Sequence, residues 1–430
     1  MVVKVIGAGL AGCEAAYQLS KRGIKVELYE CKPITKSPAH KTDLFGELVC
    51  SNSLKSDLLS TAGGLLKAEL RMLDSLIISI ADKTKVPAGS ALAVDRTLFA
   101  EAVTDYINSD PNITVKNELI EDWDLTQPTI IATGPLTVGK LADKIAERLG
   151  DNLHFYDAAA PIISGDSIDY SKAFIADRYG KGDSDYVNCP MNKEEYTEFY
   201  NALVSAECAE LKSFETVDVF EGCMPVEVMA KRGFNTLCFG PLRPVGFRYE
   251  DGKKPFAVVQ LRRENVAGDM YNIVGFQTNL KFGEQKRVFS LIPALHDANF
   301  LRYGVMHRNS YINAPKTLSR CFAVKRNPST FIAGQLSGVE GYVESIMSGL
   351  VSGINAANLV RGLNVVDFPD TTIIGSLSKY LETENENFQP MNANFGILPP
   401  LEVRTKDKTQ NKLLYSERSL KDLEKVAHLI

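Results

Sequence analysis

The chain opens with VVKVIGAGLAG at residues 2–12. Residues 2–6 are mostly β-branched and nearly all apolar, a pattern typical of a strand buried on both faces of a parallel sheet. Glycines follow at once in G-x-G-x-x-G spacing, and a helical stretch then runs over residues 10–22, with Gly23 just beyond it. This order predicts a strand, a tight turn and a helix.

A second strand is predicted at residues 25–30, and it ends in Glu30. Glu30 lies 18 residues after Gly12, close to the ~20 expected for the acid that binds a ribose hydroxyl. The alternative is a tight turn that only happens to be rich in glycine. We favour a dinucleotide site with the phosphates at the helix N-terminus, contacted by Gly7, Ala8, Gly9, Leu10, Ala11, Gly12 and Glu30.

Two later segments are predicted to be buried strands that run into a glycine, at residues 128–134 and 330–335. Apolar residues then recur at helical spacing over residues 343–354. Gly349 and Gly353 leave one face of that helix smooth, which predicts a close approach to a sheet.

This order of segments resembles two-dinucleotide-binding-domain flavoproteins of the glutathione-reductase type. The resemblance favours FAD as the resident cofactor and implies contacts at Gly134 and Gly334, with Gln335 in place of the usual aspartate. We predict an α/β protein: a Rossmann-like FAD-binding domain with an inserted α+β substrate domain. The predicted parts are residues 1–134 plus 327–365 for the FAD domain, 135–326 for the insertion that binds RNA or another substrate, and 366–430 for a C-terminal segment packed on the FAD domain.

Composition excludes disorder, because 45% of the 430 residues are hydrophobic and 23% are charged. The net charge of −5, taken over the whole chain, argues against a nucleic-acid partner. The charge is, however, unevenly distributed along the sequence. Residues 222–326 hold 17 Lys and Arg against 7 Asp and Glu, a local charge of +10. Aromatic residues such as Phe282 and Tyr303 lie between these cations and offer stacking surfaces beside phosphate contacts, as an RNA-binding surface would. The alternative is an ordinary solvated face, which is the more frequent origin of such a run of charge.

The eight cysteines form no C-x-x-C pair, and the five histidines lack the spacing of a metal site. We therefore expect neither a disulfide framework nor a bound metal. No apolar run approaches ~18 residues and the first strand begins at Val2, so we expect no membrane span, no signal peptide and a cytoplasmic location.

Two cysteines stand in local settings that differ from core packing. Cys50 is followed by polar residues in a loop or helix start, where amide donors would favour the thiolate. Cys223 stands in the sequence Gly-Cys-Met-Pro, where Gly and Pro predict an exposed turn. A thiol beside a flavin can add to a conjugated carbon and leave again. The alternative for any cysteine is a small buried hydrophobe, which we expect for Cys13 and Cys31.

A set of stretches that spans nearly the whole chain in order carries a further resemblance. The stretches are VIGAGLAGCEAAYQL, KSPAHKTDLFGELVCSNSLKSD, VPAGSALAVDR, IIATGPL, FYDAAAP, YVNCPM, FEGCMPVEVMAKRG, VVQLR, YNIVGFQT, YGVMHRN, AGQLSGVEGYVES and NFQPMNANFG. Together they resemble one family, the folate- and FAD-dependent tRNA (uracil-5-)-methyltransferases TrmFO. Lys41 and Gly46 depart from it, since members more often carry His and Ala there.

The resemblance implies transfer of a carbon from 5,10-methylenetetrahydrofolate to C5 of a uridine in the tRNA T loop. Reduced FAD would supply the hydride, and NADH or NADPH would reduce the flavin. Cys223 would add to C6 of the uracil, while Cys50 would sit near the flavin and guard the adduct or take the C5 proton. The target base would be extruded from the T loop, and the basic region 222–326 would hold the RNA backbone of the T arm. No obligate protein partner is expected.

Other functions remain open from the sequence. The same chemistry on a 23S ribosomal RNA uridine occurs in a branch of the family. A flavin oxidoreductase for small molecules would share the fold without the RNA, and a folate- or flavin-dependent RNA-binding scaffold would share the RNA without the transfer. Longer flavoproteins of the GidA type carry an additional C-terminal helical domain, for which we expect no room in these 430 residues.

Overall fold

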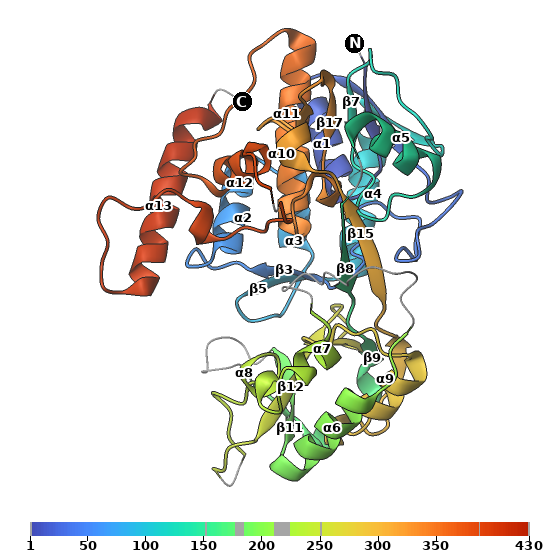
Figure 1. Cartoon of the computed structure of the whole chain (residues 1–430), viewed down its shortest axis with the longest axis vertical. Helices are drawn as coiled ribbons and strands as arrows, with labels where there is room; N and C mark the ends of the chain where they lie inside the picture. The colour runs from blue at the N-terminus through green and yellow to red at the C-terminus, as the bar shows by residue number, and fades with distance from the viewer. Residues whose placement is uncertain are drawn as a thin grey trace.

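The computed structural model describes residues 2–150, 153–176, 185–209, 224–249, 252–386 and 388–428. The described residues form two hydrophobic cores. We call residues 159–304 the smaller unit and the remainder the larger unit. Figure 1 shows the larger unit above and the smaller unit below, with both chain ends on the larger unit.

The larger unit is built on a six-stranded sheet with the order β16-β17-β7-β1-β2-β6. All neighbouring pairs are parallel except β16-β17. The carboxyl ends of the parallel strands therefore meet at one edge, the usual place for a ligand in such a sheet. The strands are β1 (Val2–Ile6), β2 (Lys25–Glu30), β6 (Ile113–Asn117), β7 (Thr129–Ile131), β16 (Ala323–Val324) and β17 (Asn327–Ile332).

Helices α1 (Leu10–Lys21) and α11 (Tyr342–Arg361) pack tightly against each other beside this sheet. A Cβ atom on Gly349 would lie 2.2 Å from the carbonyl oxygen of Ala11, and one on Gly353 would lie 2.8 Å from that of Ala15. The prediction that these glycines admit a sheet was therefore wrong. They admit the backbone of α1, because two helices on one face can approach this closely only where a side chain is missing.

The rest of the larger unit surrounds the sheet with helices, a short three-stranded sheet of order β3-β5-β4, and strands that lead to the smaller unit. These elements are β3 (Ser53–Ser56), α2 (Ala62–Met72), α3 (Leu76–Lys83), β4 (Lys85–Val86), β5 (Ala91–Val94), α4 (Arg96–Ser109), α5 (Gly139–Leu149) and α10 (Ala314–Thr317).

The smaller unit holds a second six-stranded sheet, antiparallel throughout, with the order β10-β11-β12-β13-β9-β14. Its core is rich in aromatic rings, among them Tyr196, Phe199, Phe276 and Phe289. The described elements are β9 (Ile162–Ser164), β10 (Phe174–Ile175), β11 (Tyr186–Met191), α6 (Lys193–Ser205), α7 (Val226–Lys231), α8 (Thr236–Phe239), β12 (Ala257–Arg263), β13 (Met270–Ile273), α9 (Phe282–Phe289) and β14 (Phe300–Arg302).

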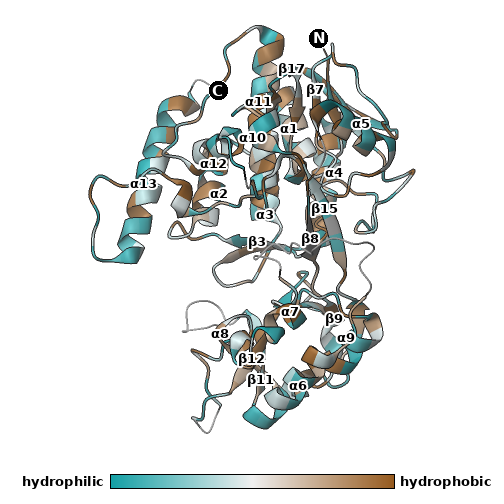
Figure 2. Ribbon diagram, viewed as in Figure 1, coloured by the Kyte–Doolittle hydropathy of each residue, from teal (hydrophilic) through white to brown (hydrophobic). Residues whose placement is uncertain are grey.

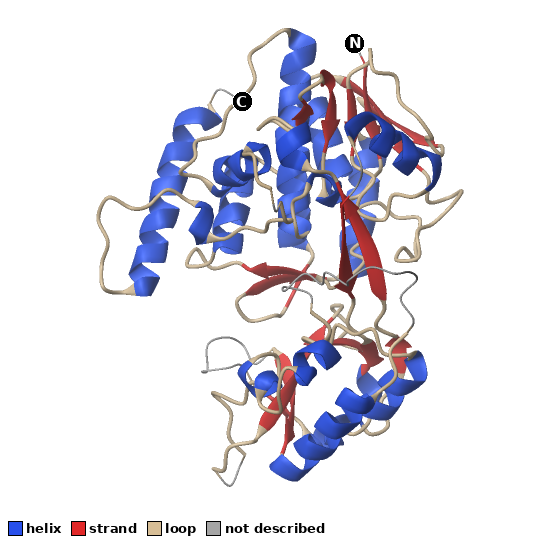
Figure 3. Ribbon diagram, in the orientation of Figure 1, coloured by secondary structure: helices blue, strands red, loops and turns tan. Residues whose placement is uncertain are grey.

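An antiparallel ribbon joins the two units. The chain enters the smaller unit along β8 (Leu153–Ala158) and returns along β15 (Met306–Tyr311), and His154 lies opposite Ser310 in the register. Figure 3 shows this ribbon in red, running from the larger unit toward the smaller one.

Side-chain packing suggests a shorter insertion than the predicted residues 135–326. Leu141 and Ile145 of α5, together with Ile312 and Leu318, belong to the hydrophobic core of the larger unit and not to that of the smaller unit. We therefore propose that the inserted domain comprises about residues 159–304, and that its flanks fold with the FAD-binding part.

The C-terminal residues pack on the hydrophobic core of the larger unit. Phe368, Ile374, Leu377 and Phe388 are all part of it. Helix α12 (Ile373–Glu382) is largely buried, whereas α13 (Lys408–Ala427) is mostly hydrophilic and buries only Ser416, Ser419 and Leu423. Figure 2 shows this contrast in the teal colour of α13.

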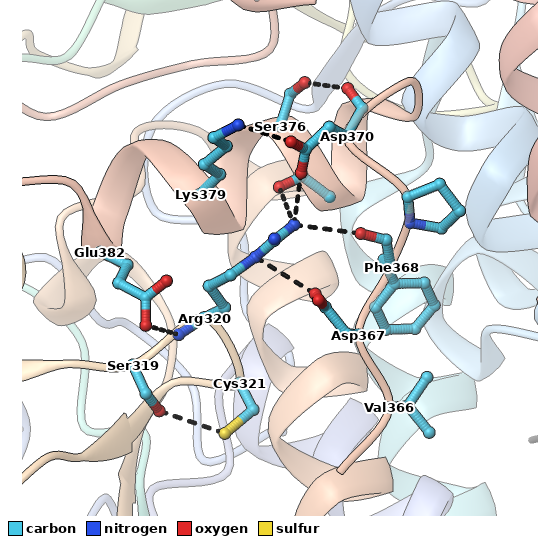
Figure 4. A network of polar contacts seen from close by, with 12 residues as sticks. Ser319, Arg320, Cys321, Val366, Asp367, Phe368, Asp370, Ser376, Lys379 and Glu382 are labelled. Carbon is cyan, nitrogen blue, oxygen red and sulfur yellow. Dashed lines mark hydrogen bonds and ion pairs between the residues drawn. The ribbon is translucent and has the colours of Figure 1, made fainter.

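Arg320 ties the turn before β16 to this C-terminal segment (Figure 4). Its Nη2 donates to the carbonyl oxygen of Phe368 at 3.1 Å and to Asp370 Oδ1 at 2.6 Å. Its Nε lies 3.2 Å from Asp367 Oδ1, and Lys379 Nζ lies 2.5 Å from Asp370 Oδ2. One guanidinium thus joins residues about fifty positions apart.

Glu69 of α2 holds the same segment from the other side. Its carboxylate accepts from the backbone N–H groups of Ile373 and Ile374 at 2.8 and 2.9 Å, and from Ser419 Oγ at 2.5 Å. Burial raises the pKa of Glu69 to about 7, although these three donors oppose the rise.

We expect stability to fall as pH rises from about 4.5 to about 7, because the raised pKa of Glu69 disfavours the ionised form in the folded state. The stabilisation that protonated Glu69 contributes is fully present below its pKa in the unfolded chain. It is lost as pH rises through its pKa in the folded chain, and it amounts to roughly 3 kcal/mol. Urea unfolding of wild type and Glu69→Gln at pH 5 and pH 8 measures it. The variant should lose this part of the pH dependence, whereas exposed Glu101→Gln should keep it.

A candidate dinucleotide site beside a cysteine loop

The glycine turn after β1 has the geometry that its sequence predicts. Gly7 has φ +101°, and a Cβ there would lie 2.6 Å from the carbonyl oxygen of Ala132. A Cβ on Gly12 would lie 1.8 Å from the carbonyl oxygen of Gly7. Gly9 has nothing within 4 Å of its would-be Cβ. The outer glycines therefore permit the turn and the close packing, while Gly9 borders open space at the start of α1.

Glu30 lies beside this turn, at the end of β2. Its Oε2 accepts from the N–H of Ala8 at 2.9 Å, and its Oε1 accepts from the N–H of Lys32 at 2.9 Å. Each carboxylate oxygen can accept a further hydrogen bond. Glu30 is thus oriented by the backbone and retains acceptor capacity for a ribose hydroxyl.

Gly134 and Gly334 follow β7 and β17 at the same edge, and both have positive φ angles, +77° and +76°. A Cβ on Gly134 would meet nothing within 4 Å, and one on Gly334 would lie 3.4 Å from the Cβ of Ala11. Gln335 donates from Nε2 to Glu340 Oε2. Its side chain therefore holds the loop after β17.

The structure brings these predicted residues together at one edge. Leu10 and Ala11 begin α1, whose first-turn N–H groups have no side-chain cap. Free amides at a helix N-terminus, open space at two glycines and an oriented carboxylate are the donor and acceptor set that a pyrophosphate and a ribose need. These residues therefore fit the dinucleotide of FAD.

The loop of Cys50 lies in a bend before β3, so the helix start considered from the sequence is absent there. The N–H of Cys50 donates to Tyr342 Oη at 2.7 Å, and Arg96 Nη2 donates to the Cys50 carbonyl at 3.3 Å. Arg96 also donates to the Leu48 carbonyl, and Arg302 to the Val49 carbonyl. Two guanidinium groups thus hold the backbone of the cysteine loop.

Both guanidinium groups interact electrostatically with Cys50 itself. Burial lowers the pKa of Arg302, and the neighbouring charge of Arg96 lowers it further. Burial raises the pKa of Tyr342, with a smaller contribution from Cys50. The Tyr342 phenol therefore stays protonated, as a fixed acceptor for the cysteine loop.

Asn52 connects this loop to the smaller unit. Its Nδ2 donates to the carbonyl oxygens of Val94 and Arg263, both at 2.9 Å, and its Oδ1 accepts from Arg262 Nε at 3.0 Å. Arg96 makes the second connection, because its Nη2 lies 2.6 Å from Oε2 of Glu264. Cys50 thus lies where the two units meet.

Cys223, the other predicted catalytic residue, lies outside the described residues. Met224, the next residue, is buried, and the N–H of Val226 donates to the carbonyl oxygen of Gln277 at 2.7 Å. The position of Cys223 relative to Cys50 stays a prediction.

A cavity of about 1190 Å³ lies between the two units. The larger unit contributes Lys41, Val138 and His307, and the smaller unit contributes Phe282 and Arg302. Burial lowers the pKa of His307, and the nearby charges of Arg302 and Lys41 lower it further. Since Arg302 also reaches the Val49 carbonyl, the cavity adjoins the Cys50 loop.

Sequence reasoning missed Asn52, Arg96, Arg302 and Tyr342 as residues that hold the Cys50 loop. Arg96 and Tyr342 stand within the matched stretches VPAGSALAVDR and AGQLSGVEGYVES. Nothing in those stretches indicates that either side chain hydrogen-bonds to the backbone of the Cys50 loop, because that loop is distant in the chain. Cys13 is a buried core residue as expected, and burial raises its pKa. Cys31 is half-buried rather than buried, and burial raises its pKa too.

Among the residues that the structure describes, no three His, Cys, Asp or Glu side chains come together as a possible metal site. In the same part of the chain, no helix is both long and apolar enough to cross a membrane.

The wound parallel sheet, the glycine turn and Glu30 define a dinucleotide-binding protein of the Rossmann-like class. The family model described as glucose inhibited division protein A matches residues 2–364. A solved structure of GidA from Aquifex aeolicus covers 99% of this chain and 73% of its own, with a TM-score of 0.71 and 16% identity. A second crystal form of the same protein gives a TM-score of 0.70. The predicted fold class is confirmed.

Closer relatives extend along the full chain. A protein of Acetivibrio thermocellus is 56% identical over 98% of this chain and 97% of its own length. One from Bacillus subtilis is 54% identical over 100% of this chain and 99% of its own. Both are named methylenetetrahydrofolate–tRNA-(uracil-5-)-methyltransferase TrmFO. The chain belongs to the TrmFO family, as the resemblance predicted.

We expect Gly9→Leu to fold but to lose most of its bound flavin, because a Cβ there meets nothing within 4 Å and a longer side chain would occupy the space beside the start of α1. Flavin absorbance per mole of purified protein measures the loss. Gly283→Leu is the matched control, since its Cβ also meets nothing within 4 Å but it lies on α9 of the smaller unit. Full flavin content in Gly9→Leu would contradict the assigned site.

Proposed function

We propose that this protein methylates C5 of a uridine in tRNA, with 5,10-methylenetetrahydrofolate as carbon donor and FAD as the flavin. The observation that carries the proposal is identity of 54% or more to TrmFO relatives over nearly the full length of both chains. The dinucleotide site at the sheet edge supports the flavin part independently. When bound and reduced, FAD supplies the hydride that turns the transferred carbon into a methyl group.

The chain's own residues bind and orient the flavin. Amides at the start of α1 receive the pyrophosphate next to Gly9, and Glu30 accepts from a ribose hydroxyl. The C-terminal stretch NFQPMNANFG contacts the loop after β17 and the start of α11. The N–H of Glu340 in the loop donates to the carbonyl oxygen of Met391 at 2.9 Å, and the N–H of Ala393 donates to Oε1 of Glu344 in α11 at 2.9 Å. Gln335, in that same loop, is thereby held at the site.

Cys223 adds to C6 of the target uracil, which makes C5 nucleophilic toward the folate carbon. Cys50 takes the proton that leaves C5 as the methyl group forms. The support for this division is the cationic surroundings of Cys50, with Arg96 and Arg302 holding its loop. The target base leaves its stack to reach these groups.

The finer parts of the proposal concern the partners. The uridine lies in the T loop, the T arm is held by the basic stretch 222–326, and NADH or NADPH reduces the flavin in the cytoplasm. The local charge of +10 supports the RNA surface, because phosphate contacts by Lys and Arg dominate affinity for RNA.

Nucleoside analysis of tRNA and of 23S ribosomal RNA, from cells with and without this protein, tests the proposal. We expect 5-methyluridine to disappear from tRNA alone. Loss of 5-methyluridine from ribosomal RNA alone would show that ribosomal RNA is the substrate of the same reaction. If neither RNA loses 5-methyluridine, RNA methylation is rejected. Purified protein with labelled folate, FAD and either NADH or NADPH would then identify the reductant.

A further inference from the structure

Three aromatic rings of the smaller unit stack in a row at the cavity between the units. The rings of Phe300 and Tyr303 are 5.2 Å apart, centroid to centroid, and 3° from parallel. Those of Tyr303 and Phe282 are 4.8 Å apart and 14° from parallel. We call Phe300, Tyr303 and Phe282 the ring stack. It continues into the core through Phe289, whose centroid lies 6.4 Å from that of Phe300.

Phe282 is the outer end of the ring stack. Tyr303 stacks with two rings, whereas Phe282 stacks with one ring and is 54% exposed. Phe282 and Tyr303 both line the cavity. An exposed phenylalanine is ordinary, but one held at the end of a rigid stack offers a preorganised flat surface.

Positive charge lines the same cavity. Lys41 and Arg302 line it, with Asp143 as the acidic residue of the lining. Exposed apolar side chains, Val138 and Leu301, complete the walls. A flat ring next to cations is the combination that binds a nucleobase together with its phosphates.

We propose that Phe282 stacks against an unpaired nucleobase of the RNA substrate, while Lys41 and Arg302 attract the phosphates beside it. The inference rests on the proposed function, which supplies RNA as the ligand. An RNA base is favoured over the ring of a nicotinamide reductant because the ring stack belongs to the stretch 222–326 with its charge of +10. The cavity, about 1190 Å³, also has room for flanking nucleotides.

Tryptophan fluorescence of Phe282→Trp tests the contact directly. The native chain has one tryptophan, Trp123, which is 5% exposed and donates from Nε1 to Thr330 Oγ1 at 3.1 Å. The holoprotein variant should lose fluorescence of the introduced indole when a T-arm hairpin RNA is added, since stacking on a base quenches it. Wild-type protein, which reports Trp123 alone, should change little.

Affinity gives the second readout. Phe282→Ala should weaken binding of the hairpin by about 5- to 150-fold, the range for loss of one base–aromatic stack, and Phe282→Trp should retain it. Phe239→Ala is the matched control, because Phe239 is 85% exposed in the same unit but lies outside the cavity lining. Lys41→Gln should reduce the salt dependence of binding by one phosphate contact.

Equal RNA affinity in wild type and Phe282→Ala would overturn the inference, as would quenching by NADH or NADPH in place of RNA. A second assay, transfer of labelled methylene from folate to the same hairpin, tests the proposed function separately from the stacking contact. If wild type methylates the hairpin and Phe282→Ala binds it equally well, the stacking contact alone is wrong. If the hairpin quenches the indole but is never methylated, the contact stands and the methyltransferase proposal fails.

Discussion

Replacement of Cys223 by alanine should abolish the covalent adduct that this protein forms with a T-arm RNA carrying 5-fluorouridine at the target position. The thiolate adds to C6, C5 then takes up the folate carbon, and fluorine cannot leave C5 as the proton does. The cysteine therefore stays bonded to the RNA in the wild type. Denaturing electrophoresis of labelled RNA measures the adduct, and we expect its complete loss in Cys223→Ala.

The companion variant Cys50→Ala separates the two thiols. If Cys50 only removes the C5 proton, this variant should still form the adduct with 5-fluorouridine, yet turn over normal RNA at least about 100-fold more slowly. Cys208→Ala is a control in the smaller unit, where the thiol is half-buried. An undiminished adduct in Cys223→Ala, combined with its loss in Cys50→Ala, would reverse the roles.

Replacement of Arg96 by methionine should destabilise the junction between the two units by about 3–5 kcal/mol, the cost of leaving a buried carboxylate without its partner. The side chain of Glu264 is 1% exposed, and Arg96 lies 2.6 Å from it. The same change removes the donors to the carbonyl oxygens of Leu48 and Cys50. Methyl transfer should therefore fall together with the urea midpoint.

A second substitution identifies the cause of that loss. Arg96→Met/Glu264→Gln removes the uncompensated charge, so it should recover part of the stability but not the activity. Lys116→Met breaks an ion pair with Glu27 at the surface and should lower the urea midpoint far less, because solvent screens an exposed pair. Equal midpoints in Arg96→Met and Lys116→Met would show that the pair at the junction contributes no more than a surface pair.

The sequence was most informative where one feature occupies consecutive residues. Residues 2–12 carry a buried strand, a glycine turn and the start of a helix, and the structure has β1, the turn and α1 there. Gly7 and Gly12 could be assigned because their spacing encodes a local shape. Gly349 and Gly353 show the limit, since a smooth face could be predicted but its partner, α1, could not.

The surroundings of Cys50 show the same limit at the site. The sequence marked the residue as unlike a core cysteine, but not which groups hold it. Its loop is held by Arg96, Arg302 and Tyr342, which lie 46 to 292 positions away from their backbone partners. A carbonyl oxygen or an N–H is present at almost every residue, so a hydrogen bond to one leaves no trace in the residue pattern.

The amino-acid sequence by itself determined the Rossmann-like class, the dinucleotide turn with Glu30, and the family. These follow from short-range patterns and from similarity along the whole chain. Only the tertiary structure decided that the Cys50 loop lies at the junction of the two units, and that Phe282 ends a ring stack at a cationic cavity. Both depend on side chains that long-range packing places together, because burial and charge at a point in space sum over residues far apart in the chain.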